Sequence, residues 1–233
     1  MLLFTGGLDS LMAWRAAGEP DCLYVLQEGN PYAQQELDAI GRLVRRIPSL
    51  RVQAVGGSPQ PPVESDGHVQ HRNLSLIVTA AQYSDVIMIG ALRGETSPDK
   101  SRSFMRAAEV ALSKSERRQV HVLAPLKGLT KTQALRRHIK RWPQDQPVLM
   151  QTYSCYRGDE CGECQACFRR WVALYLNGVE WWTDFTSHPW MRQTSWKDLG
   201  YMRRTSEWYG VARNNLEAWK AIKEKRREVA RNS

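Results

Sequence analysis

The chain has 233 residues, of which 42% are hydrophobic and 24% are charged, and its formal net charge is +9 at pH 7. These values suit a soluble globular protein with one good core, or with one domain and an appendage. No apolar run approaches the ~20 residues that span a bilayer and no signal peptide is evident, so we expect a cytoplasmic protein that does not act at a membrane.

The first motif is TGGLDS, which runs from Thr5 to Ser10 between two short apolar segments. This order predicts a buried strand, a glycine turn and a helix that begins near Asp9. Glycine lets a ligand approach the backbone, and free N–H groups at a helix amino terminus attract anions, most naturally phosphate. An ordinary strand–helix turn is the alternative. The motif lacks the Walker lysine and the third glycine of a dinucleotide fingerprint.

Strands and helices are predicted to alternate after this motif. The expected strands are 21–26, 51–55, 85–89 and 120–124. The expected helices are 33–44, 73–83, 101–112 and one that Thr130 caps. Such alternation favours an α/β fold with a doubly wound parallel sheet, in which ligands bind beyond the carboxyl ends of the strands. The segments expected to meet there are TGGLDS, 27–32, 91–100 and 125–131.

Four of the five cysteines form the pattern C-x5-C-x2-C-x2-C. They are Cys155, Cys161, Cys164 and Cys167. Four soft thiolates on short loops suit a closed, structural zinc site. An iron–sulfur cluster would use the same ligands, and free structural cysteines are the remaining alternative. Cys22 stands alone in a strand-like run, and we expect it in the core.

The character of the chain changes after about residue 177. Six of the nine tryptophans follow that point, and from Trp190 onward eleven Lys/Arg against five Asp/Glu supply +6 of the net charge. A basic tail can bind nucleic acid or an acidic partner, and a solvated helix face explains it equally well. Residues 211–231 predict a charged helix whose apolar stripe packs on the core or on a partner. The stripe comprises Leu216, Trp219, Ile222 and Val229.

TGGLDS and the segment SCYRGDECGECQACFRR, residues 154–170, together resemble the 7-cyano-7-deazaguanine synthase (QueC) family of PP-loop ATP pyrophosphatases. That family carries an SGGxDS loop and an SCY…CGxCxxC zinc knuckle. Further pairs stand where the family has its YGQ…EL, RN, PDCRPEF and PL…SK elements. They are Gly29-Asn30 with Glu36-Leu37, Arg72-Asn73, Pro98-Asp99 with Phe104, and Pro125-Leu126 with Thr130-Lys131.

The resemblance implies a sheet of the adenine nucleotide alpha hydrolase-like, PP-loop type, with a small zinc knuckle and a helical carboxyl-terminal extension. On this basis residues 1–150 form the PP-loop ATP-binding domain, and residues 151–177 form the knuckle with its docking helix. Residues 178–233 form a Trp-rich basic helical extension, which the resemblance does not cover.

The resemblance also implies an ATP-dependent carbon–nitrogen ligase. In the family, 7-carboxy-7-deazaguanine is adenylated and pyrophosphate leaves into the SGGxDS loop. Ammonia then displaces AMP to give an amide, and a second ATP drives conversion of the amide to the nitrile. The implied cofactors are ATP, Mg²⁺ and structural Zn²⁺.

Site residues follow by position. The ATP and pyrophosphate contacts are Thr5, Gly6, Gly7, Leu8, Asp9, Ser10 and Lys131, and the catalytic residues are Asp9, Ser10 and Lys131. Asp9 is placed as a magnesium ligand and Lys131 as a phosphate contact, although Asp9 capping a helix and a solvated Lys131 are simple alternatives. The substrate contacts are Arg72, Asn73, Asp99 and Lys100. Asp99 matches a carboxylate that can accept from a guanine-like ring.

Other functions stay open at this point. This chain has Lys-Ser-Arg-Ser at 100–103 where the family has Cys-Arg-Pro-Glu, which leaves the acceptor of the activated group undecided. Some relatives occur in antiphage defence systems, where the deazapurine would be joined to a protein amine docked on the tail. A PP-loop tRNA-modifying ligase or sulfurtransferase, and a non-catalytic binding module, are further alternatives. The family and the aromatic tail also suggest a homodimer.

Overall fold

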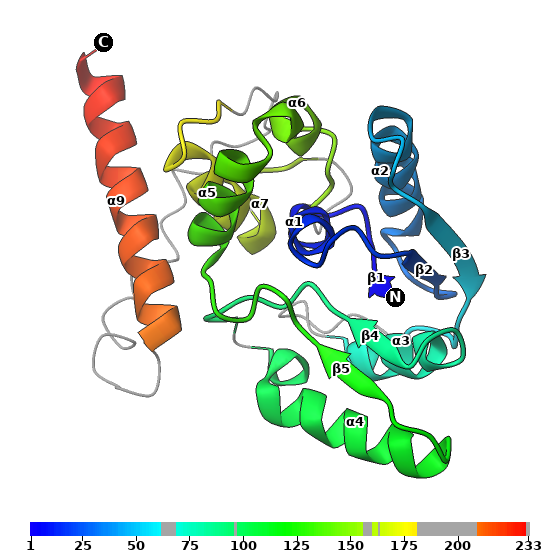
Figure 1. The fold of residues 1–233 in the computed structure, drawn as a ribbon. Coiled ribbons are helices and arrows are strands. Elements are labelled where there is room, and N and C mark those ends of the chain that lie inside the picture. The colour runs from blue at the N-terminus through cyan, green and yellow to red at the C-terminus, as the bar shows by residue number, and fades with distance from the viewer. Residues whose placement is uncertain (62–68, 96, 156–159, 163, 181–208, 232–233) are drawn as a thin grey trace. The chain divides into compact units, whose positions relative to one another are not determined.

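The computed structural model describes the chain except for residues 62–68, 96, 156–159, 163, 181–208 and 232–233 (Figure 1). The chain folds into two compact units. The first comprises Met1–Leu92, Thr96–Lys127 and Gln151–Tyr153. The second comprises Arg93–Glu95, Gly128–Met150 and Ser154–Ser233.

The first unit is built on a five-stranded sheet in the order β3-β2-β1-β4-β5, and all its strand pairs are parallel. The strands are β1 (Leu2–Leu3), β2 (Cys22–Leu26), β3 (Val52–Gly56), β4 (Val86–Met88) and β5 (His121–Leu123). Leu2 of β1 stands opposite both Cys22 and Met88, so strand order reverses beside β1. Ligands bind at such a reversal, and β1 is the strand that leads into TGGLDS.

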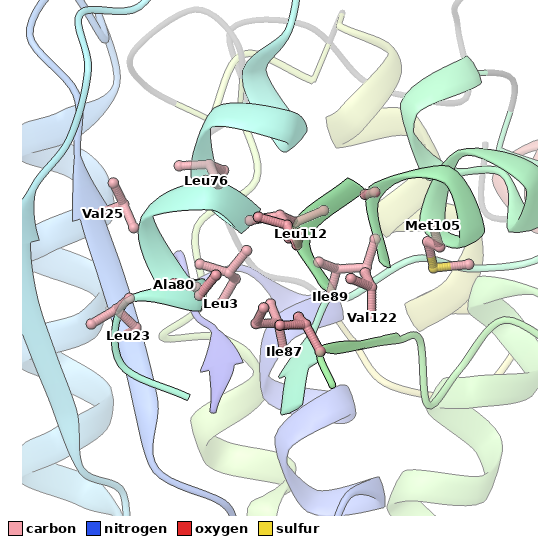
Figure 2. Close-up of a cluster of buried hydrophobic side chains, with 14 of the residues drawn as sticks. Leu3, Leu23, Val25, Leu76, Ala80, Ile87, Ile89, Met105, Leu112 and Val122 are labelled. Atoms are coloured by element: carbon pink, nitrogen blue, oxygen red, sulfur yellow. The ribbon is translucent and has the colours of Figure 1, made fainter. Parts of the chain in front are cut away.

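Helices cover both faces of this sheet, as the alternation predicted (Figure 1). They are α1 (Leu8–Ala16), α2 (Ala33–Arg46), α3 (Arg72–Ala81) and α4 (Arg102–Ser115), with a short 3₁₀ turn η1 (Pro98–Lys100) before α4. Leu23 and Ile87 lie in an apolar cluster with residues of α3 and α4 (Figure 2). Tyr24, the next residue along β2, reaches α2 instead, where its hydroxyl donates to Glu36. Successive strand residues point to opposite faces, so β2 anchors both helix layers.

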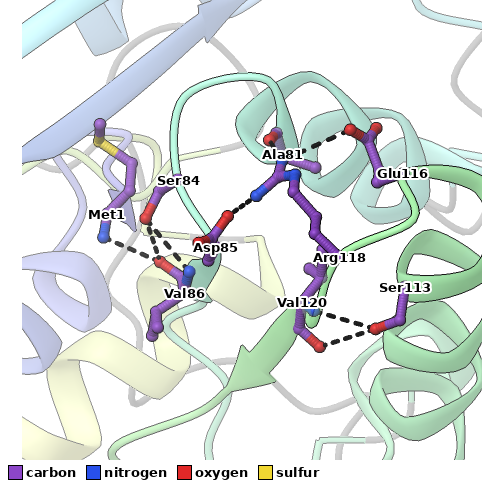
Figure 3. A network of polar contacts seen from close by, with 9 residues as sticks. All are labelled: Met1, Ala81, Ser84, Asp85, Val86, Ser113, Glu116, Arg118 and Val120. Atoms are coloured by element: carbon purple, nitrogen blue, oxygen red, sulfur yellow. Dashed lines mark hydrogen bonds and ion pairs between the residues drawn. The ribbon is translucent and has the colours of Figure 1, made fainter.

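A polar network fixes the edge of the sheet at β4 and β5 (Figure 3). The Arg118 guanidinium contacts the Asp85 carboxylate and donates to the carbonyl oxygen of Ala81. The Ser113 hydroxyl accepts from the Val120 N–H at 2.9 Å and donates to the Val120 carbonyl oxygen at 3.3 Å. The turn between α4 and β5 is thereby tied to α3 and β4.

The described part of the second unit is helical. Its elements are α5 (Lys131–Arg141), η2 (Pro143–Asp145), α6 (Gln146–Leu149), α7 (Gln165–Tyr175) and α9 (Tyr209–Arg231). Thr130 caps α5, which confirms the predicted cap. Its hydroxyl accepts from the Gln133 N–H at 3.2 Å, and its own N–H donates to the Gln133 side chain at 3.1 Å. This reciprocal capping box satisfies two backbone donors at the start of the helix.

Helix α9 packs on α7 through Ala221 and Ile222, which lie against Phe168, Trp171 and Val172. Of the predicted apolar stripe, Ile222 therefore packs on the core, whereas Leu216 and Val229 are 58% and 44% exposed and the Trp219 side chain lies outside the described part of the structure. The helical extension itself is confirmed. Among the described residues, no helix combines the length and apolar character that crossing a bilayer requires.

The boundaries 1–150, 151–177 and 178–233 stay a prediction. Five of the six tryptophans after residue 177 lie outside the described residues, and so does the first part of the extension. They are Trp181, Trp182, Trp190, Trp196 and Trp208.

Candidate functional site

The TGGLDS loop is closely packed on two sides. Gly6 has φ +70°, and a Cβ built there would lie 2.9 Å from the Ala39 Cβ and 3.0 Å from the carbonyl oxygen of Glu36. A Cβ on Gly7 would lie 3.2 Å from the carbonyl oxygen of Tyr153. The Tyr153 N–H donates to the Gly6 carbonyl oxygen at 2.9 Å. The loop backbone is thus held between the first turn of α2 and the segment 151–153, with little room for side chains.

Helix α1 begins at the end of this loop, and its N-cap residue is a glycine, which has no side chain to cap the amino terminus. Gly7 is the N-cap residue, and Asp9 and Ser10 lie in the first turn. The Ser10 hydroxyl donates to the Gly7 carbonyl oxygen at 2.9 Å. Gly90, which follows β4, packs against this turn, since a Cβ there would lie 3.3 Å from the Asp9 carbonyl carbon. An uncapped helix amino terminus at the reversal of the sheet is a suitable place for a phosphate group.

All four predicted substrate residues lie in the first unit, at the start of α3 and in η1. Arg72 and Asn73 open α3, and the Asn73 side-chain amide donates to the Asp99 carbonyl oxygen at 3.4 Å. The Asp99 carboxylate accepts a hydrogen bond from the Ser97 hydroxyl. Lys100 is the last residue of η1, directly after Asp99. The start of α3 and the turn η1 therefore form one cluster.

A buried carboxylate, Glu36, extends this cluster toward the sheet. Its Oε2 accepts from the Tyr24 hydroxyl and from the Asn30 amide, each at 3.0 Å, and its Oε1 lies 3.4 Å from the Arg72 guanidinium. Burial raises the pKa of the Glu36 carboxyl, and Arg72, Tyr24 and Asn30 oppose that rise. Burial, with Glu36 nearby, also raises the pKa of Tyr24.

Sequence reasoning did not give Glu36 a role. A signal was present, because Glu36 shares a helical face with Ile40 and Leu43, and both of these are buried. An acidic residue on the buried face of a helix requires a partner in the fold.

Lys131 lies in the second unit, where it is the first residue of α5. The preceding Thr130 is fully buried, and its hydroxyl donates to the Glu217 carboxylate of α9 at 3.1 Å. The role of Lys131 as a phosphate contact stays a prediction.

The four clustered cysteines meet in the second unit, and all are buried. Their Sγ atoms lie within 4.8 Å of one another, and those of Cys155 and Cys161 are 3.6 Å apart. Zn–S bonds of about 2.3 Å in a tetrahedron would place sulfur atoms about 3.8 Å apart, so the cluster fits zinc. The N–H groups of Cys164 and Cys167 point to the Sγ atoms of Cys161 and Cys164, at 3.3 and 3.4 Å. Such donors stabilise thiolates.

The close approach of these sulfur atoms changes the pKa of a thiol in the cluster. Hydrogen bonds with the Cys155 and Cys164 thiols, together with burial, raise the pKa of the Cys167 thiol. A bound cation reverses this effect, since metal coordination deprotonates a thiol. Cys22, by contrast, is buried in β2 of the first unit, as predicted for a core residue.

Arg170 of α7 anchors the cysteine segment and was missed by the sequence reasoning. Its side chain is fully buried, pairs with Glu160 at 2.9 Å and donates to the Leu149 carbonyl oxygen at 3.1 Å. Glu160 directly precedes Cys161, so the pair connects a ligand-bearing loop to α6 and α7. An arginine three residues after the last cysteine was the available signal.

Comparison with known proteins agrees with this arrangement. A family model described as "Queuosine biosynthesis protein QueC" matches residues 58–178. A 7-cyano-7-deazaguanine synthase from Persephonella marina is 29% identical over 237 residues, covering 83% of this chain and 96% of its own. One from Chlorobium phaeobacteroides is 27% identical over 224 residues, covering 81% and 97%. One from Methanosarcina barkeri is 31% identical over 147 residues, covering 58% and 62%.

Proposed function

Because the chain belongs to the QueC family, we propose that it adenylates 7-carboxy-7-deazaguanine with ATP and converts it with ammonia, through the amide, to 7-cyano-7-deazaguanine. Two relatives named 7-cyano-7-deazaguanine synthase align with more than four fifths of this chain. The observation that carries the proposal is the uncapped start of α1 after two tightly packed glycines, at the reversal of a parallel sheet.

The TGGLDS loop receives the pyrophosphate. In adenylation, an oxygen of the substrate carboxylate attacks the α-phosphorus of ATP, and the bond to the bridging oxygen breaks. Negative charge then grows on the departing pyrophosphate. The N–H groups of the first turn of α1 and the positive end of its dipole stabilise that charge. Packing at Gly6 and Gly7 holds these donors in place, so they need not reorganise during the reaction.

Asp9 holds the magnesium ion that accompanies ATP, directly or through water, because Mg²⁺ prefers carboxylate and phosphate oxygens. The ion neutralises phosphate charge. Ser10 contributes its hydroxyl to the first turn of α1, where Asp9 also lies. Lys131 contributes a positive charge that attracts a phosphate group. The position of Asp9 in the first turn of α1, beside the proposed phosphate site, supports the assignment.

The deazapurine lies against Arg72, Asn73, Asp99 and Lys100. The Asp99 carboxylate accepts hydrogen bonds from ring N–H groups, which would be costly to bury unpaired. Arg72 and Lys100 supply positive charge for the carboxylate that is activated. Ammonia attacks the carbonyl carbon of the adenylate, and AMP leaves with the bonding electron pair. The second ATP activates the amide oxygen in the same loop, and loss of that oxygen with AMP gives the nitrile.

Zinc has a structural role in this scheme. Four cysteine ligands leave no open coordination position, so the ion stabilises the fold and takes no part in the chemistry. The four Sγ atoms lie within 4.8 Å of one another, which supports this role.

The test is to incubate the full chain with 7-carboxy-7-deazaguanine, ATP, magnesium and ammonium and to follow the products by mass spectrometry. We expect the nitrile, with two AMP and two pyrophosphate released for each molecule. Absence of AMP formation with this carboxylate would contradict the proposal and would favour a binding module.

A second candidate function rests on the distribution of charge. The second unit carries 20 Lys/Arg and 12 Asp/Glu, a net charge of +8, whereas the first carries 13 and 12, a net charge of +1. Helix α5 contributes an exposed basic face made of Arg136, Arg137, Lys140 and Arg141. Such a surface suits an acidic partner. We therefore propose, as the alternative, that the activated deazapurine is joined to an amine of an acidic protein, as in an antiphage system.

The same assay separates these functions. Accumulation of the amide alone, or a mass-shifted partner protein, favours the protein acceptor. Steeply salt-dependent tRNA binding would favour a tRNA-modifying enzyme. A homodimer also stays a prediction, which sedimentation of the full chain would test.

A further inference from the structure

The first turn of α2 touches both binding segments of the first unit. Its backbone packs on the TGGLDS loop, because the Glu36 carbonyl oxygen, with the Ala39 Cβ of the next turn, occupies the space where Gly6 would carry a Cβ. Its one buried carboxylate, that of Glu36, reaches the start of α3, where it lies 3.4 Å from Arg72. Glu36 therefore contacts the proposed pyrophosphate loop through its backbone and the proposed substrate residues through its side chain.

The donors around Glu36 come from separate segments of the chain. Tyr24 belongs to β2, Asn30 to the loop after it, and Arg72 to α3. Asn30 also accepts from the Tyr32 N–H at 3.0 Å, directly before α2 begins. The Glu36 carboxylate thus contacts a strand, a loop and the start of a helix at the carboxyl edge of the sheet.

We propose that Glu36 is a positioning residue that aligns Arg72 with the deazapurine and couples the start of α3 to the TGGLDS loop. This inference rests on the proposed function, because it assigns Arg72 to the substrate. Arg72 continues directly into Asn73, whose side chain holds η1 through the Asp99 carbonyl oxygen. Displacement of Arg72 is therefore transmitted to Asp99 as well.

The chemistry of the contacts requires a carboxylate at this position. An ionised carboxylate only accepts hydrogen bonds, and Glu36 faces a hydroxyl, an amide and a guanidinium that all donate to it. Glutamine would turn its own N–H₂ toward one of these donors. It would also remove the negative charge that holds Arg72, so the guanidinium would turn away from its observed position.

The test compares Glu36→Gln with Asp38→Asn in steady-state assays at about pH 8, well above the ordinary carboxyl pKa. Asp38 lies on the same helix but is exposed, and it accepts a local bond from Gln34. We expect Glu36→Gln to raise the KM for 7-carboxy-7-deazaguanine by about tenfold or more, with the KM for ATP changing less. Asp38→Asn should leave both KM values near those of the wild type. Unchanged substrate KM in a folded Glu36→Gln would overturn the proposal.

A double-mutant cycle with Arg72→Lys shows whether Glu36 acts through Arg72. Since Lys cannot reproduce the planar guanidinium, the single change should itself raise the substrate KM. If Glu36 positions Arg72, Glu36→Gln adds little to Arg72→Lys. Fully additive effects would contradict the proposal.

Binding of magnesium pyrophosphate, measured by calorimetry, tests the coupling to the loop without relying on the reaction. Glu36→Gln should weaken this binding more than Asp38→Asn does. Circular dichroism confirms that each variant is folded. Tyr24→Phe serves as a milder change, because it removes one hydrogen-bond donor to Glu36 and keeps the Glu36 carboxylate. If the wild type does not turn over the carboxylate, the proposed function fails. Pyrophosphate affinity equal in Glu36→Gln and Asp38→Asn would refute the coupling itself.

Discussion

The backbone N–H of Tyr153 donates a hydrogen bond of 2.9 Å to the carbonyl oxygen of Gly6, and so joins a distant segment of the chain to the TGGLDS loop. The loop is packed from the other side by the first turn of α2. Its backbone N–H groups are consequently fixed before any ligand arrives. Such preorganisation lets hydrogen-bond donors stabilise charge without the cost of reorganisation.

Replacement of Gly6 by alanine should abolish adenylation. The backbone at φ +70° costs roughly 1–2 kcal/mol for a residue with a side chain, and the new Cβ would also clash with Ala39 and Glu36. Gly18 supplies a matched control, because it has φ +84° and nothing within 4 Å of its Cβ position. Gly18→Ala should show the backbone cost alone in chemical unfolding and should keep AMP formation. Equal activity of the two variants would contradict this account of the loop.

Asp9→Asn should stop AMP formation while leaving the fold intact. Asparagine has nearly the same shape but lacks the negative charge that a magnesium ion requires. The measurement is AMP release in the presence of the carboxylate substrate, with circular dichroism as the check on folding. Release at the wild-type rate would refute the assigned role.

Cys161→Ser should lose zinc and destabilise the chain, because a structural metal contributes its binding free energy to folding. Cys22→Ala is the control, since Cys22 is buried in the first unit and belongs to no cluster of potential metal ligands among the described residues. Metal content by mass spectrometry should fall only in the first variant. A wild-type chain that folds normally without metal would contradict the assignment. Iron together with labile sulfide in the purified chain would mean that the four cysteines hold an iron–sulfur cluster and not zinc.

Ile222→Ala should weaken the packing of α9 on α7. Ile222 is 2% exposed among Phe168, Trp171 and Val172, and loss of such a side chain costs about 2–5 kcal/mol. Val229→Ala on the same helix is the control, because Val229 is 44% exposed and its truncation should cost little. The free energy of unfolding from urea titrations gives both values. Similar losses of unfolding free energy in the two variants would mean that α9 does not pack through the face that carries Ile222.

Local patterns predicted the features that depend on local interactions. Apolar periodicity marked the strands and helices, the cysteine spacing marked the cluster, and Thr130 marked the start of α5. The missed features join segments that are distant in sequence. Glu36 draws its donors from residues 24, 30 and 72, and Tyr153 reaches Gly6 only once the sheet has formed. Arg170 lies in a run with Arg169 that is typical of a surface, yet its side chain is fully buried.

The raised pKa of Glu36 predicts how its contribution to stability varies with pH. Burial raises the pKa in the folded state, and Arg72, Tyr24 and Asn30 only partly oppose it. The folded chain therefore keeps a proton on this carboxyl at pH values where the unfolded chain has lost it. The resulting stabilisation is complete below the ordinary carboxyl pKa and is lost as pH rises through the folded-state value.

Urea titrations of the wild type and Glu36→Gln between about pH 4 and pH 8 measure this effect. The free energy of unfolding of the wild type, relative to that of Glu36→Gln, should fall as pH rises, because the amide does not titrate. Asp38→Asn, a change at an exposed residue of the same helix, is the control. A relative stability that rises with pH would instead mean that Arg72 and the two neutral donors outweigh burial, with the folded-state pKa below that of the unfolded chain.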